Sequence, residues 1–140
     1  MRGAGLLAVA IVALSATACD EAKLCDRLET GYHWASTAHG ALAAAIPALE
    51  APWQALETLH AALTIECDRA RAGGQFNASY LRAMVSQGAT LVAQIAGLVA
   101  QFGAARETGS LDSPSRAVAA ALDAEAMRAS MLELAAKAKR

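Results

Sequence analysis

Residues 25–67 read CDRLETGYHWASTAHGALAAAIPALEAPWQALETLHAALTIEC, a stretch with a cysteine at each end and Ile46-Pro47 near its middle. Two helices joined by a short turn run antiparallel, so residues that face each other have numbers with a constant sum. For a bonded Cys25–Cys67 pair the sum is 92, which places the turn at residue 46. Proline restricts the residue before it and independently marks a helix end at that point. The agreement predicts an antiparallel helical hairpin closed by a disulfide.

The same register predicts which rings of the hairpin meet. Tyr32 should face His60, and His39 should face Trp53, because each pair satisfies the same sum. His33 falls off this line. We interpret the four facing rings as an aromatic–polar cluster that packs between the two helices.

Inward histidines of a helical bundle can also bind metal or haem, with Met84, Met127 or Met131 as soft partners. The chain has no Cys-x-x-Cys-His haem attachment and no Cys-x-x-Cys pair. His39 and His60 are about one heptad apart along the hairpin, which is too far for them to share a metal easily. We expect no cofactor, and a carrier of metal, haem or a small apolar ligand is the alternative.

Helix-breaking and capping residues divide the rest of the chain. Gly73-Gly74 ends the second helix, since glycine tolerates a left-handed conformation at a helix C-terminus. Asn77 is a good N-cap for the third helix. Ser113-Pro114 opens the fourth, with proline at the first helical position. The predicted fold is all-α, a small four-helix bundle with helices over about 21–46, 51–72, 77–105 and 114–138.

The third predicted helix carries no charge from residue 83 to 105, so a transmembrane span must be considered. Against a span, Gln87, Gln94 and Gln101 recur every seven residues. A glutamine stripe in lipid would need partners, whereas in water it is the solvated face of an amphipathic helix. We therefore expect a central bundle helix. Its Gly88 and Gly97 permit close approach of another helix, either within the bundle or at an interface.

The N-terminal residues 1–18 read MRGAGLLAVAIVALSATA and are followed by Cys19. Arg2, the apolar run 6–14 and the small residues after it have the pattern of an export signal peptide. Nine apolar residues span only about half of a ~30 Å hydrocarbon layer, which suits a signal peptide better than an anchor. We expect cleavage directly before Cys19, leaving residues 19–140 as a single helical domain.

Residues Ala16-Thr17-Ala18-Cys19 resemble the lipobox of bacterial lipoproteins, although that family most often has leucine where Ala16 stands. The resemblance implies that Cys19 becomes the lipidated N-terminus, carrying palmitate or a similar acyl chain. Ala16 and Ala18 also fit the A-x-A pattern of ordinary signal peptidase, which would cut the same bond. Three cysteines leave one thiol unpaired in an exported chain, and lipid on Cys19 would leave Cys25 and Cys67 as one pair.

This resemblance implies a protein held by lipid on the extracytoplasmic face of a bacterial membrane, in the periplasm, with a soluble secreted protein as the alternative. Without Arg2 the chain has 11 basic residues (12 minus one) against 13 acidic ones, a balance that gives no basic patch for nucleic acid. No Gly-x-Ser-x-Gly nucleophile elbow occurs. We expect no enzyme. The prediction is a binding or scaffolding protein that contacts the membrane through its anchor and contacts a protein partner or a second copy.

Overall fold

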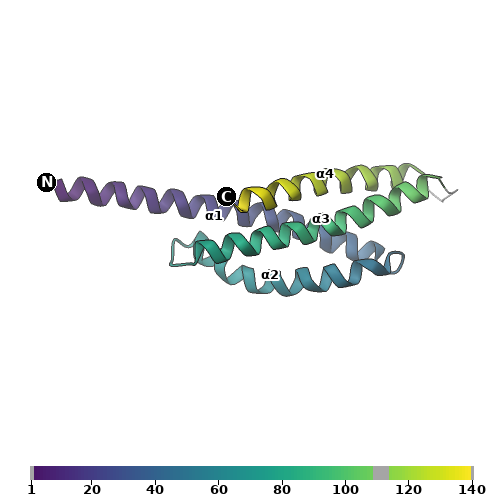
Figure 1. Ribbon diagram of the computed structural model, residues 1–140, viewed down its shortest axis with the longest axis horizontal. Coiled ribbons are helices and arrows are strands. Elements are labelled where there is room, and N and C mark those ends of the chain that lie inside the picture. Colours follow the sequence, from purple (N-terminus) through teal and green to yellow (C-terminus); the bar gives the residue numbers. More distant parts are fainter. Residues whose placement is uncertain (1, 109–113, 140) are drawn as a thin grey trace.

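The computed structural model describes the backbone of residues 2–108 and 114–139 and the side chains of residues 20–103 and 123–139. Over these ranges every long element is a helix, and four of them pack together (Figure 1). This confirms the predicted fold class. The elements are α1 (Arg2–Leu42), the short 3-10 helix η1 (Pro47–Leu49), α2 (Glu50–Arg71), α3 (Ala78–Thr108) and α4 (Pro114–Ala138).

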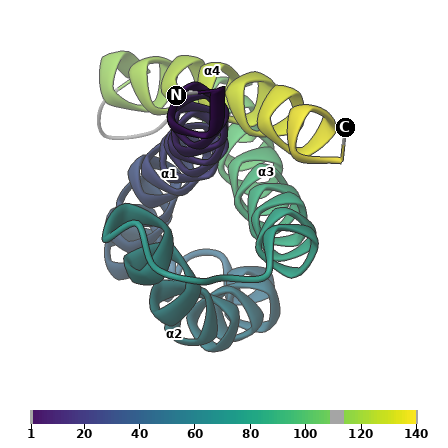
Figure 2. The same cartoon turned by 90° about the vertical axis from the view of Figure 1, so that its left-hand side faces the viewer.

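The helices follow one another in an up-and-down order. α1 and α2 form the predicted antiparallel hairpin, and α3 runs back between α2 and α4, which lies antiparallel along it (Figures 1 and 2). α1 and α3 are therefore parallel and in contact, with Gly88 beside Leu28 and Gly31 beside Val92. The N-terminal part of α1 extends beyond the other helices (Figure 1).

The ends of α2 and α3 have the predicted caps. Gly73 has a φ of 72° and donates its N–H to Ala70 O at 3.3 Å, and Gly74 donates to Arg69 O at 2.9 Å. This pair of hydrogen bonds is the Schellman motif, which satisfies carbonyls that a helix end leaves free. Asn77 Oδ1 accepts a hydrogen bond from the N–H of Tyr80 at 3.0 Å, as an N-cap does. Ser113, the predicted N-cap of α4, lies outside the described residues.

The turn of the hairpin differs from the prediction in detail. α1 ends at Leu42, four residues before Ile46, because Ile46 has an extended backbone (φ −126°, ψ 81°) ahead of Pro47. Ile46 and Leu49 are buried, so the connection packs into the hairpin. At its other end α1 continues through the predicted signal segment to Arg2, whereas the sequence predicts a helix start at about residue 21.

The core runs continuously through the bundle and consists mainly of leucine, valine and alanine. Gln87, Gln94 and Gln101 are exposed, which confirms the predicted solvated face of α3. Within Ala78–Gly103 a stretch of 18 residues has a mean hydropathy of 1.5, enough for a membrane span, yet 56% of that stretch is buried inside the bundle. The largest fully buried side chains include Leu28, Leu49, Leu56, Leu81, Ile95, Met131 and Leu134.

Gly31 lies where α4 crosses α1, and we expect a methyl group there to be costly. A Cβ at Gly31 would lie 2.6 Å from Met131 Sδ and 3.4 Å from Val92 Cγ1, and Met131 is only 2% exposed. Gly31→Ala should lower the free energy of unfolding by about 1–3 kcal/mol through overpacking. Gly40→Ala on the same helix meets nothing within 4 Å and should raise it by up to ~1 kcal/mol. Urea denaturation of both variants measures the contrast, and an equal response would contradict it.

Candidate functional site

The hairpin disulfide is present in the structure. Cys25 on α1 and Cys67 on α2 are bonded with a Cα–Cα distance of 6.0 Å across a sequence separation of 42 residues. Both cysteines are buried, so the bond lies inside the packed face of the hairpin. The predicted pairing of these two cysteines is therefore confirmed.

Four aromatic rings form a continuous column between α1 and α2. The Tyr32 and His60 rings are stacked with centroids 3.6 Å apart and an interplanar angle of 1°. His39 stacks on Trp53 at 4.9 Å, and Tyr32 stacks on Trp53 at 5.5 Å. Both predicted ring pairs are confirmed, and Tyr32 also links them into one column.

A carboxylate binds the histidine at each end of this ring column. His60 Nε2 donates to Glu29 Oε2 at 2.7 Å, and His39 Nε2 donates to Glu50 Oε2 at 2.9 Å. The hydrogen bonds from His39 and then from Gln54 hold the pKa of Glu50 below its usual 4.5. Sequence reasoning missed both carboxylates. Both carboxylates could have been predicted from the hairpin register. The residue numbers of Glu29 and His60 have the same sum as those of Glu50 and His39, and this sum is three below that of the two cysteines.

Both histidines of the ring column are thus bound to carboxylates. Glu57 and His60 have the Glu-x-x-His spacing found in bundle metal sites, but His60 instead stacks on Tyr32 and binds Glu29. Among the side chains that the structure describes, no group of three or more His, Cys, Asp or Glu could hold a metal ion. Met131, one of the proposed soft partners, packs against Gly31. The arrangement joins the two helices through stacking and charge-assisted hydrogen bonds.

A narrow groove of about 310 Å³ runs between α1 and α2 beside the disulfide. Leu28 and Leu63 contribute its apolar surface, and the His60–Glu29 pair lies within it. Arg71, also on its lining, binds Asp26 at 2.8 Å across the hairpin. The groove is therefore bordered at two places by ion pairs that connect the same two helices as the disulfide.

The alkaline titration of Tyr32 should report the integrity of this column. Burial, followed by the negative charges of Glu57 and Glu29, raises the pKa of Tyr32 above 10.0. A raised folded-state pKa contributes stability that is complete below pH 10 and is lost as pH rises through the folded pKa. Absorbance at ~295 nm, recorded for the protein and for Tyr32→Phe, isolates this phenol by difference. If the difference between the two titration curves has its midpoint at or below pH 10, the result would contradict the burial of Tyr32 in the ring column.

Glu21 on α1 and Arg82 on α3 form a second polar feature, close in sequence to the predicted lipid site. Glu21 is 1% exposed, and its Oε1 accepts a hydrogen bond from Arg82 Nε at 2.8 Å. Its Oε2 has no hydrogen-bond partner. This pair was not predicted, because nothing in the sequence sets the register between two helices that are not consecutive. Cys19 lies within α1, and its side chain is outside the described residues.

The glycines of α3 have separate roles. Gly88 lets α3 approach α1, since a Cβ there would lie 3.0 Å from Leu28 and 3.1 Å from Leu59. Gly97 instead lies beside the side chain of Arg128 on α4, 3.8 Å from where a Cβ would be. The close approach expected at Gly88 is therefore internal to the bundle.

Comparison with known proteins gives no relative for this chain: no family model, curated protein or solved structure matches it.

Proposed function

We propose that this protein is exported and anchored by lipid on Cys19, and that its helical domain binds or scaffolds other proteins at the membrane surface. The observation that carries the proposal is the Cys25–Cys67 disulfide. Structural disulfides persist mainly in oxidising compartments such as the bacterial periplasm. The bond also accounts for two of the three cysteines. The third, Cys19, lies in the lipobox-like sequence.

The position of the anchor supports a role at the membrane surface. Glu21, two residues after Cys19, is already buried in the bundle. Lipid on Cys19 would hold the domain within one or two residues of the membrane interface. The acyl chains of a lipoprotein provide the two membrane-binding signals that stable anchoring requires.

The ring column gives the two histidines nearest the interior a structural role. Each stacks on an aromatic ring and binds a carboxylate, and together these contacts join α1 to α2. No observation favours the alternative of a metal, haem or ligand carrier over this proposal. Visible absorbance and metal analysis of the purified protein test that alternative directly.

Metabolic labelling with a palmitate analogue tests the anchor. We expect the full chain produced in a bacterium to take up the label and to fractionate with membranes. Cys19→Ala should lose the label, while Cys25→Ala should keep it, because the signal segment is unchanged. An unlabelled wild-type chain, or equal labelling of Cys19→Ala, would refute lipid attachment at this residue.

A further inference from the structure

On the outer surface formed by α3 and α4, residues 83–101 of α3 carry no charge, whereas α4 carries charges of both signs. On α3 the outward positions repeat by fours and threes: Ala83, Gln87, Thr90, Gln94, Gly97 and Gln101. On α4 the positions beside them are Glu125, Arg128, Leu132 and Lys139, which share one helix face. Leu132 is 44% exposed, one of the large apolar side chains that the described surface leaves in water. We call these residues the α3–α4 face.

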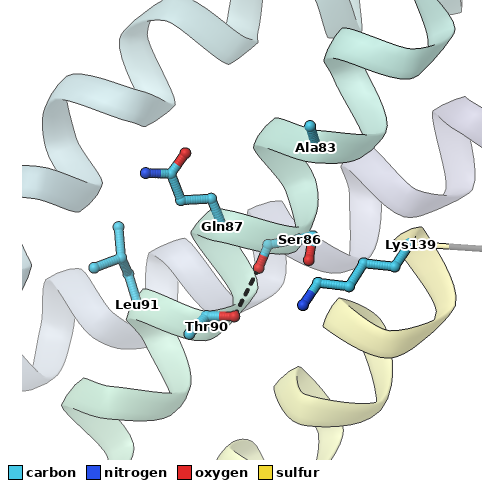
Figure 3. A pocket seen from close by; sticks show the side chains of 6 residues that line it. All are labelled: Ala83, Ser86, Gln87, Thr90, Leu91 and Lys139. Atoms are coloured by element: carbon cyan, nitrogen blue, oxygen red, sulfur yellow. Dashed lines mark hydrogen bonds between the residues drawn. The ribbon is translucent and has the colours of Figure 1, made fainter.

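Two shallow hollows mark the ends of the α3–α4 face. The first, of about 410 Å³, lies at Ser86 and Thr90, toward which Lys139 extends (Figure 3). Thr90 Oγ1 donates to Ser86 O at 2.9 Å, so this hydroxyl is satisfied within its helix (Figure 3). The second hollow, of about 540 Å³, lies at Gln94 and Gly97 and is bordered by Glu125 and Arg128. The first hollow thus carries a cation of α4, and the second carries both an anion, Glu125, and a cation, Arg128.

Contacts within the bundle fix how far along α3 each α4 residue lies. Ser86 Oγ donates a hydrogen bond to Ala135 O at 3.2 Å, and Gly97 lies beside Arg128. The residue numbers of these neighbouring pairs sum to 221 for Ser86 with Ala135 and to 225 for Gly97 with Arg128. Leu132 lies level with residue 91 of α3 on this register, midway between the two hollows.

The α3–α4 face is self-complementary under a two-fold rotation that reverses the helices. When two copies of α3 lie antiparallel so that the numbers of facing residues sum to 184, the stripe of one copy faces the stripe of the other. Thr90 then faces Gln94, and Gln87 faces Gly97. On two antiparallel copies of α4 whose facing residue numbers sum to 264, Lys139 faces Glu125 and Leu132 faces its own copy. The centres of the two sums, residues 92 and 132, agree with the α3–α4 register to within about one residue. A two-fold interface requires this kind of self-complementary surface.

We propose that the α3–α4 face binds a second copy of this chain in an antiparallel, two-fold pair. Leu132 meets its own copy near the axis, and Lys139 of each protomer binds Glu125 of the other. Gln94 of each α3 can donate a hydrogen bond to the Thr90 hydroxyl of the other near the centre. The inference deepens the scaffolding role proposed above by naming a partner, but the pairing itself does not depend on export or lipid.

The area of the α3–α4 face determines how tightly we expect the two copies to bind each other. The α3 stripe is about 27 Å long, and two adjacent helices are roughly 20 Å wide, so the pair buries about 1,000 Å² in total. That area is at the lower end for specific interfaces, so the pair should dissociate on dilution. Because the rotation reverses the helices, the two N-terminal ends point in opposite directions, and both anchors reach one membrane when the pair lies flat on it.

Cysteine cross-linking tests the two-fold axis. The full chain carrying Cys19→Ala has no free thiol, and Leu132→Cys adds one at the predicted axis. With a short bismaleimide in detergent solution, we expect this variant to form a covalent dimer. Ile65→Cys adds a thiol at a residue that is 57% exposed on α2, away from the α3–α4 face, and should stay monomeric. No dimer with Leu132→Cys, or an equal yield with both variants, would overturn the proposal.

Charge reversal tests the predicted ion pairs without relying on a thiol. Lys139→Glu places like charges opposite each other twice in the pair, and we expect the dissociation constant to rise roughly tenfold. Lys139→Glu with Glu125→Lys restores opposite charges and should restore dimerisation. Sedimentation equilibrium measures all three proteins. An unchanged constant in the single variant, or no recovery in the double variant, would overturn the proposed register. These measurements use purified protein and do not depend on lipid attachment. A negative result in the lipid-labelling experiment would therefore not decide whether the protein dimerises.

Discussion

Removal of the hairpin disulfide in the double variant Cys25→Ala/Cys67→Ala is expected to lower the free energy of unfolding by about 4 kcal/mol. The bond closes a loop across 42 residues, and its main effect is to restrict the unfolded chain. A domain of this size typically has a total stability of only about 5–15 kcal/mol. The loss is therefore a large fraction of the stability of a bundle whose core contains many alanines.

Urea denaturation with and without a reducing agent measures this effect. Wild-type protein under reducing conditions should unfold at the same urea concentration as the double variant, and Cys19→Ala should unfold with the oxidised wild type. The stacked rings and the Arg71–Asp26 pair still connect α1 and α2, so the double variant should keep its helical circular dichroism in the absence of urea. A double variant as stable as the oxidised wild type would show that the bond does not stabilise the fold.

Arg82→Ala is expected to destabilise the bundle by about 3 kcal/mol, more than a typical surface arginine would. The substitution leaves the carboxylate of Glu21 buried without its counter-ion, and breaking a buried pair in this way costs roughly 3–5 kcal/mol. The lower end applies because Arg82 is itself 30% exposed, so water reaches its side of the pair.

The informative control removes both charges together. Glu21→Leu with Arg82→Met replaces the pair by apolar side chains, which is often neutral or stabilising at a buried site. We expect this double variant to be more stable than Arg82→Ala alone, by about 2 kcal/mol or more. Thermal unfolding at neutral pH compares the three proteins. If Arg82→Ala and the double variant lose the same amount, the cost does not come from the unpaired carboxylate.

Local signals in the sequence predicted the hairpin well. Pro47 and the two cysteines define one register, and this register correctly pairs Tyr32 with His60. The register works because consecutive helices joined by a short turn have a fixed geometric relation. The same relation contains the Glu29–His60 and Glu50–His39 contacts, which a wider search along it would have found.

Contacts between helices that are distant in sequence could not be predicted in this way. The Glu21–Arg82 pair joins α1 to α3, and the close contact of Gly31 with Met131 joins α1 to α4. Each depends on how far one helix slides along another, which is set by packing of the whole bundle rather than by a turn.

Non-reducing mass spectrometry of the protein extracted from bacterial membranes, after alkylation of free thiols, tests lipid attachment and the disulfide in one experiment. We expect a chain that begins at Cys19, carries acyl groups on that residue and takes up no alkylating agent, because Cys25 and Cys67 are bonded. A chain that retains residues 1–18, or that is alkylated at its cysteines, would contradict this expectation.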